Sequence, residues 1–210
     1  MKMTIRVAVV ALVLMVMQGV AKAQGFFGFM RGNPLMLLNQ ESVQKELKLT
    51  DEQKTKINEL RQSAREKMQE IFQADQAERQ QKMQALNQEN RKALETILNA
   101  EQGKRILEIV YQQRGAMAFA DPEVAKALNL NEEQQGKVKT TTEEMAAAMR
   151  ELFTQGQAPD EEARKKMDEL RKSTGEKLVA LLTPEQKTKW TALQGEPFKG
   201  EIRFGRPQQQ

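Results

Sequence analysis

Apolar residues recur along most of the chain at the three- and four-residue spacing of an amphipathic helix. Three stripes have this spacing: Ile57, Leu60, Ala64, Met68, Ile71 and Phe72; Met83, Leu86, Ala93, Leu94 and Ile97; Val138, Met145, Met149 and Leu152. The alternation of apolar and polar residues that is typical of a half-buried strand does not occur. The pattern predicts an all-α protein. Because each stripe is narrow, we expect elongated helical hairpins that pack against one another or dimerise.

A nine-residue motif, Leu-[Thr/Asn]-x-Glu-Gln-x-x-[Lys/Arg]-apolar, interrupts these stripes four times. Its Leu, its Thr or Asn, and its Gln are Leu49, Thr50 and Gln53; Leu98, Asn99 and Gln102; Leu130, Asn131 and Gln134; Leu182, Thr183 and Gln186. Thr or Asn followed three residues later by Gln is the pattern of a capping box, which starts a helix. Each motif therefore predicts a corner at which one helix ends and the next begins.

The four motifs are arranged as two copies of a pair. Gln53 and Gln134 are 81 residues apart, and Gln102 and Gln186 are 84 apart, with aliphatic and Met positions in register at each offset. This spacing predicts an internal duplication, with one helical unit over residues 41–115 and a second over 116–195.

The offset between the two copies increases from 81 to 84 residues, so the second copy contains an insertion of three residues. The second copy contains Gly156 and Pro159, which break a helix, followed by Asp160 as a cap. By comparison, we expect the first copy to bend near Ala74–Asp75, with Asp75 as the cap and Glu78 completing a capping box. The first copy has no helix-breaking residue there, so one continuous helix from about 51 to 97 is the alternative.

The first 23 residues have the three parts of a secretory signal peptide. Lys2 and Arg6 precede an apolar run over 7–17, and Ala21-Lys-Ala23 is a small-x-small cleavage site. We expect cleavage after Ala23 and export to the periplasm or the extracellular space. An uncleaved anchor is the alternative, although the run is shorter than the about 20 residues that span a bilayer.

Export changes how the charge is interpreted. The net charge of +4 suggests nucleic acid as a partner, but the predicted signal peptide carries three of the 33 basic residues and no acidic one. The mature chain then has 30 basic and 29 acidic residues, so we expect no nucleic-acid partner and, after cleavage, no stable membrane span.

The absence of His and Cys from the sequence narrows the chemistry further. It excludes disulfides, thiolate zinc sites, and Ser-His-Asp and Cys-His catalysis. Adjacent acids occur at Glu132/Glu133, Glu143/Glu144 and Glu161/Glu162. They lack the loop spacing of a calcium site, so solvated helix faces are expected there. We therefore predict a protein that is not an enzyme, with no catalytic residue, cofactor or metal.

Met and Phe side chains on the stripes are candidates for a client-binding surface, because Met is flexible and polarisable. The candidates are Met68, Phe72, Met83, Met145, Met149 and Phe153. The competing interpretation is that they form the seam between packed helices. Outside the units, we expect a flexible Phe/Gly-rich segment over 24–40 and a disordered tail over 196–210.

The LTxxQ corners in a small, exported helical chain resemble the Spy/CpxP periplasmic family. The family motif is complete at Leu49–Gln53 and at Leu182–Gln186, and two copies carry Asn in place of Thr. The resemblance implies an envelope stress protein or an ATP-independent chaperone that holds unfolding clients on a concave face. Family members pair as dimers, so this chain, with two tandem units, resembles a joined dimer or forms a homodimer itself.

Two functions are consistent with these features. The first is an exported, non-enzymatic chaperone whose partners are unfolded or envelope proteins. The second is a structural or assembly protein of the envelope without client-holding activity.

Overall fold

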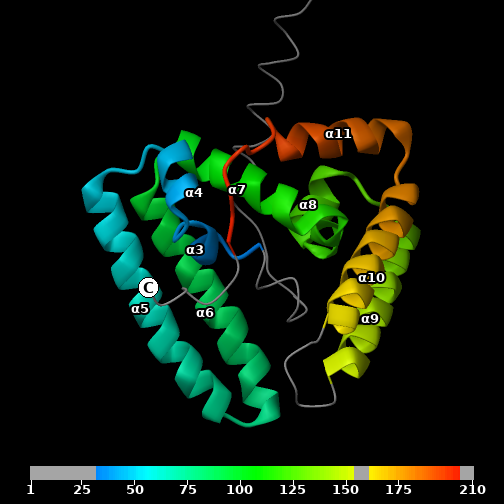
Figure 1. The fold of residues 1–210 in the computed structure, drawn as a ribbon, viewed down its shortest axis with the longest axis horizontal. Coiled ribbons are helices and arrows are strands. Elements are labelled where there is room, and N and C mark those ends of the chain that lie inside the picture. The colour runs from blue at the N-terminus through cyan, green and yellow to red at the C-terminus, as the bar shows by residue number, and fades with distance from the viewer. Residues whose placement is uncertain (1–31, 154–160, 204–210) are drawn as a thin grey trace, which may run out of the picture. The chain divides into compact units, whose positions relative to one another are not determined.

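The computed structural model describes residues 32–153 and 161–203, apart from the side chains of Gln76, Ala77, Gln80 and Phe153. These residues form α-helices, one 3-10 helix and no strand, which confirms the all-α prediction (Figure 1). The helices are α3 (Pro34–Leu37), α4 (Glu41–Glu46), α5 (Asp51–Gln73), α6 (Gln76–Ile97), α7 (Ala100–Arg114), η1 (Gly115–Ala120), α8 (Pro122–Ala127), α9 (Glu132–Phe153), α10 (Glu161–Ala180) and α11 (Pro184–Gln194). The predicted signal peptide lies outside the described residues.

The chain divides into two compact units. The first unit comprises the described residues 32–113 together with 194–203, and the second comprises those within Arg114–Leu193. The chain leaves the first unit two residues before the predicted boundary at 115 and returns to it at Gln194. Each unit has the same order of elements, namely two short helices, two long ones and one of intermediate length.

The first unit is built on the α5–α6 hairpin, whose helices lie side by side (Figure 1). The chain turns at Ala74, and the Asp75 carboxylate accepts a hydrogen bond from the backbone N–H of Glu78 at 2.9 Å. The alternative of one continuous helix is therefore wrong. The expected capping box is only half formed, because the Glu78 carboxylate pairs with Lys82 at 2.6 Å. Arg79 completes the turn by donating to the carbonyl oxygens of Phe72 and Ala74.

The core of the first unit is formed by residues of the short helices, of α7 and of both helices of the hairpin. Its buried apolar residues are Leu35, Leu37, Leu38, Val43, Leu47, Leu49, Ile57, Ile71, Leu86, Leu94, Leu98, Ile106, Ile109, Val110 and Tyr111. Three of them belong to the predicted flexible segment 24–40, so that prediction is wrong for residues 33–40. Asn33 caps α3 there, and its carboxamide oxygen accepts from the N–H of Leu35 at 2.9 Å.

The second unit has its own core, with η1 at the centre, in contact with α8, α9 and α10. The Phe119 ring of η1 meets the Trp190 ring of α11 edge to face, with centroids 4.9 Å apart and an interplanar angle of 86°. Both side chains are buried, as are Val124, Leu128, Leu130, Val138, Met149, Leu178 and Leu182. An aromatic pair of this geometry contributes about 1 kcal/mol beyond the apolar area that it buries.

The short helices α4 and α8 end in the same way. Lys48 and Asn129 follow them with φ of 50° and 54°, in the left-handed region. The next N–H closes each helix, from Leu49 to the carbonyl of Gln44 at 3.0 Å and from Leu130 to that of Ala125 at 2.9 Å. This is a Schellman motif, which usually carries Gly at the left-handed position.

Replacing Lys48 by Gly is expected to raise the free energy of unfolding by about 0.5 to 1 kcal/mol, because Gly adopts positive φ without steric cost. Asn tolerates this conformation better than Lys, so Asn129→Gly should gain less. Urea denaturation of the two variants beside the wild type measures both values. A loss of stability in Lys48→Gly would contradict the expectation.

The segment 194–203 runs beside α4 and α7 in the first unit, and we call it the strap. Its main chain is hydrogen-bonded to Gln40, Ser42, Arg105 and Gln112. The structure thus differs from the predicted disordered tail over 196–203. Sequence reasoning missed this order because helix side chains, rather than a periodic pattern in the strap, hold the segment.

Candidate functional site

The four predicted corners each begin a helix, and each makes both hydrogen bonds of a capping box. In the first, the N–H of Gln53 donates to the Thr50 hydroxyl at 3.2 Å, and the N–H of Thr50 donates to Gln53 Oε1 at 3.1 Å. The corners at Asn99, Asn131 and Thr183 repeat these two bonds. The motif leucines and the apolar residues that end the motifs are buried: Leu49, Leu98, Leu130, Leu182, Ile57, Ile106, Val138 and Trp190.

In the first unit, the side-chain amides of two corners bind each other. Gln53 Nε2 donates to Gln102 Oε1 at 2.7 Å, and Gln102 Nε2 donates to Gln53 Oε1 at 3.1 Å. Each amide nitrogen also reaches a helix-end carbonyl, Gln53 that of Ile97 at 2.8 Å and Gln102 that of Leu47 at 3.1 Å. Each glutamine therefore uses two donor and two acceptor positions, and we call this pair the glutamine clasp.

The second unit contains an equivalent clasp. Gln134 Nε2 donates to Gln186 Oε1 at 2.7 Å, and Gln186 Nε2 donates back to Gln134 Oε1 at 3.0 Å. The remaining donors reach the carbonyls of Leu181 at 2.8 Å and Asn129 at 3.2 Å. Gln102 and Gln186 are buried at 8% exposure, so the clasps lie in regions where an unpaired amide would be costly.

The clasp explains why all four motifs carry Gln. Glu completes a capping box equally well, because the box needs only an acceptor from this side chain. The clasp also needs two donors from each side chain, which an ionised carboxylate lacks. The capping box was predictable, but the pairing of corners 49 residues apart was not. The preference for Gln over Glu at all four positions was the signal that could have indicated it.

The candidate client-binding residues lie mainly on the hairpins, with unequal exposure. Phe72, at the tip of the α5–α6 hairpin, is 53% exposed, and only Met36 joins it as an exposed large apolar residue in the described part of the chain. Met68, Met83 and Met145 are half-buried. Met149 differs from the prediction because it is 1% exposed and fills the core of the second unit. The side chain of Phe153 lies outside the described residues.

Comparison with known proteins does not identify a relative. No family model, no curated protein and no solved structure matches the chain.

None of the helices within 32–153 and 161–203 has the length and apolar character needed to span a bilayer. Over those residues, no three acidic side chains come together in a way that could hold a metal ion, and the sequence has no His or Cys.

The surface charges of the long helices are largely paired within one turn. Among the predicted acidic pairs, Glu133 binds Lys137 at 2.7 Å, Glu161 binds Lys165 at 2.9 Å, and Glu162 binds Lys166 at 2.8 Å. All these groups are exposed, so solvent screens each pair and its contribution to stability is small. Hydrogen bonds from neighbouring lysines lower the pKa of four exposed carboxyls: Glu41, Asp51, Glu52 and Glu133.

Stability should be nearly constant from about pH 5.5 to 8, because the chain has no His. Below about pH 4.5 it should fall, since the lowered carboxyl pKa means that the folded state binds fewer protons than the unfolded state. The stability is then lost as pH falls through the folded pKa values. Urea denaturation at pH 3.5 to 8, in low and high salt, measures this, and salt should weaken the acid effect. A change of more than about 1 kcal/mol between pH 6 and 8 would be inconsistent with this expectation.

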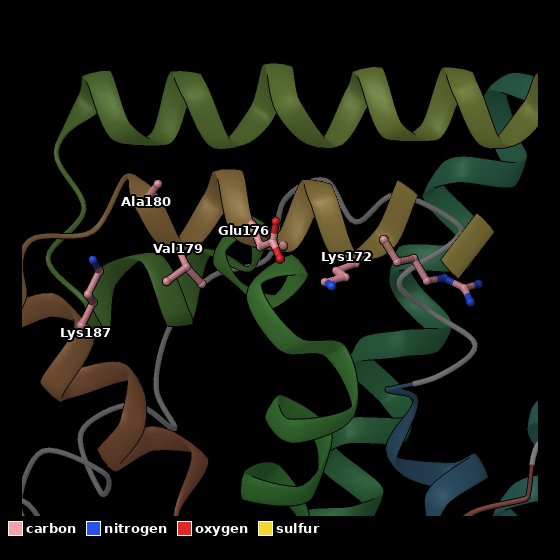
Figure 2. A pocket seen from close by; sticks show the side chains of 7 residues that line it. Lys172, Glu176, Val179, Ala180 and Lys187 are labelled. Carbon is pink, nitrogen blue, oxygen red and sulfur yellow. The ribbon is translucent and has the colours of Figure 1, made fainter. Parts of the chain in front are cut away.

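A shallow, open groove of about 540 Å³ lies on α10 and the start of α11 in the second unit. Figure 2 shows Lys172, Glu176, Val179 and Ala180 on α10 and Lys187 on α11. The groove combines a small apolar floor with both signs of charge. Its openness makes it unsuited to enclosing a small-molecule ligand, because such sites bury most of the ligand surface.

Proposed function

We propose that the protein is an exported, non-enzymatic helical chaperone that holds unfolded or envelope proteins without ATP. The observation that carries this proposal is the α5–α6 hairpin, where Phe72 at the tip is 53% exposed and Met68 and Met83, further along the two helices, are half-buried. Burying a Phe side chain gains about 2 kcal/mol. An exposed aromatic residue held on a capped turn is therefore suited to bind apolar segments of another chain.

The incomplete burial of the apolar residues of the hairpin supports the same function. Among the described side chains of the hairpin, Ile57 and Ile71 on α5 and Leu86 and Leu94 on α6 are the buried ones, so much of the apolar stripe remains partly open to solvent. Met side chains adapt to ligands of different shape, which suits a binder of many clients. The polar faces carry paired charges, which keep such a surface soluble without a strong field of one sign.

The corner motifs support the proposed relation to Spy/CpxP-like proteins. The two clasps, the matching left-handed residues at Lys48 and Asn129, and the common order of elements agree with a tandem duplication of one LTxxQ unit. On this proposal, one chain carries two client-holding hairpins. The non-enzymatic part rests on the absence of His and Cys from the sequence.

The test is the aggregation of an unfolding client, followed by light scattering without nucleotide. The mature protein should suppress aggregation at a few-fold molar excess. Phe72→Ser should require at least about threefold more protein for the same effect, because one apolar contact of up to about 2 kcal/mol is lost. Gln73→Ser, at the neighbouring exposed position, is the matched control and should act like the wild type.

No suppression by the wild type would reject the proposal. Capture of one fixed partner in a pull-down, unaffected by folding stress, would then favour the structural or assembly role. Equal suppression of aggregation by Phe72→Ser and the wild type would show that clients do not bind at the hairpin tip.

A further inference from the structure

Side chains of the first unit hold the strap by hydrogen bonds to its main chain. Arg105 Nη1 donates to the carbonyl of Glu196 at 2.7 Å, and Ser42 Oγ donates to that of Glu201 at 2.6 Å. The strap N–H of Arg203 donates to Gln40 Oε1 at 3.2 Å. Each of these bonds joins a side chain of α4, of its N-cap residue Gln40 or of α7 to the main chain of the strap, so none depends on the strap's side-chain chemistry.

Gln112 makes the largest number of these hydrogen bonds. Its Nε2 donates to the carbonyls of Gln194 at 2.6 Å and Glu196 at 2.8 Å, and its Oε1 accepts from the N–H of Phe198 at 2.8 Å. A single carboxamide thus binds three main-chain groups of one segment. This is how sites that read an extended peptide through its backbone obtain affinity for many sequences.

The two large apolar side chains of the strap are partly covered and its charged side chains are exposed. Phe198 and Ile202 are half-buried, whereas Lys199, Glu201 and Arg203 are exposed. A Cβ at Gly200, between the two apolar residues, would meet the Phe198 ring of the strap itself and would lie 2.8 Å from Ser42 Cβ. The strap sequence over 198–202 thus has the spacing apolar-x-Gly-x-apolar.

Gly195 is a second strap position at which a side chain would clash with a helix residue. Its φ is +61°, and a Cβ would meet the carboxylate of Glu108, with Oε1 at 2.7 Å. Glu108 is held in place by Arg105 at 2.8 Å, so it cannot easily move aside. Two glycines thus let the main chain approach α4 and α7 closely.

We propose that Gln40, Ser42, Arg105 and Gln112, which we call the seat, form a binding site for an extended polypeptide segment with the spacing apolar-x-Gly-x-apolar. The chain's own strap occupies the seat in this structure, and it must leave before a segment of another polypeptide binds. The seat uses residues other than the hairpin tip, so this inference stands or falls separately from the client-holding proposal.

The strap acts as a competitor of high local concentration. A tethered ligand is present at an effective concentration of the order of millimolar, so a free peptide binds the wild type weakly. Displacing the strap should remove this competition and raise the apparent affinity for a free peptide at least tenfold.

The experiment uses the full mature chain carrying Gly195→Val and Gly200→Val, which expel the strap by steric clash. A fluorescent peptide of residues 194–203 is added, and its binding is followed by anisotropy. We expect binding at least tenfold tighter than to the wild type, and loss of that binding when Gln112→Ala is added. Lys199→Val, which places the same side chain at an exposed strap position, is the control and should bind like the wild type.

A peptide in which the residues equivalent to Phe198 and Ile202 are Ala should bind weakly, whereas changes at the exposed positions should be tolerated. Failure of the folded double variant to bind the peptide, or equal binding with and without Gln112→Ala, would overturn the proposal. Circular dichroism establishes that the variant is folded.

A measurement on the wild type covers the case in which the double variant does not fold. Excess free peptide, at several millimolar, should speed hydrogen exchange at the strap N–H groups of Phe198 and Arg203. Unchanged exchange at these two groups would overturn the proposal independently of any substitution.

Discussion

Gln102→Glu is expected to lower the free energy of unfolding of the first unit by about 3 kcal/mol at pH 7. The substitution removes both donors of a buried amide, so the carbonyl of Leu47 loses its bond to Gln102 and the side-chain oxygen of Gln53 loses one of its two donors. It also places a carboxylate against oxygen atoms, with which it cannot form hydrogen bonds unless it is protonated. The local capping bonds to Asn99 need no donor from this side chain and should survive.

The loss should depend on pH in a direction that identifies its cause. Burial, together with the oxygens of Leu47 and Gln53 that would face the new carboxylate oxygen, raises the pKa of the introduced carboxyl above its value in the unfolded chain. The folded variant then binds more protons than the unfolded one, so the variant is relatively more stable at low pH and loses stability as pH rises through the raised pKa. The destabilisation relative to the wild type should therefore be smaller at pH 4.5 than at pH 7.

Urea denaturation followed by circular dichroism measures both effects. Gln69→Glu, the same change at an exposed position of α5, should alter stability by no more than about 0.5 kcal/mol. Gln186→Glu should reproduce the loss in the second unit. A loss below about 1 kcal/mol in Gln102→Glu would mean that the clasp contributes little beyond the capping box.

Trp190→Ala is expected to destabilise the second unit by about 3 to 5 kcal/mol, because it removes a large buried side chain and leaves a cavity. Trp190 is 7% exposed and provides the edge-to-face partner of Phe119, which is 1% exposed. Since the first unit has its own core, its helices should stay folded at temperatures at which the second unit has unfolded. Thermal unfolding should then show two transitions.

Hydrogen exchange can assign the two transitions. In Trp190→Ala, the amide of Val138 should lose protection while that of Ile57 keeps it. Thr191→Ala, at the next and exposed position, should leave both protected. Simultaneous loss of protection at Ile57 and Val138 would show that the two units unfold as one.

Local signals in the sequence predicted much of this fold. A capping box spans only three residues, so Thr50 and Gln53 indicate a helix start without knowledge of the rest of the chain. The apolar spacing predicted α5, α6 and α9 for the same reason. Asp75 was also identified as a cap, but whether the chain turned there depended on tertiary packing, which the sequence does not report.

Non-local features could not be predicted in this way. The clasp joins Gln53 to Gln102, and the strap joins Gln112 to Gln194, 82 residues away. The short apolar run at Leu35–Leu38 is too brief to show a period, so its burial was missed. Met149 lies on a stripe like Met145, and periodicity alone cannot tell which of them a neighbouring helix covers.

The return of the chain to the first unit affects the order in which the protein is completed. Synthesis delivers a chain from its N-terminus, so the helices of the first unit emerge well before residues 194–203. The whole second unit must pass before Gln112 can bind the strap. The first unit to emerge is therefore the last to be finished, and until then its seat is open to any extended segment nearby.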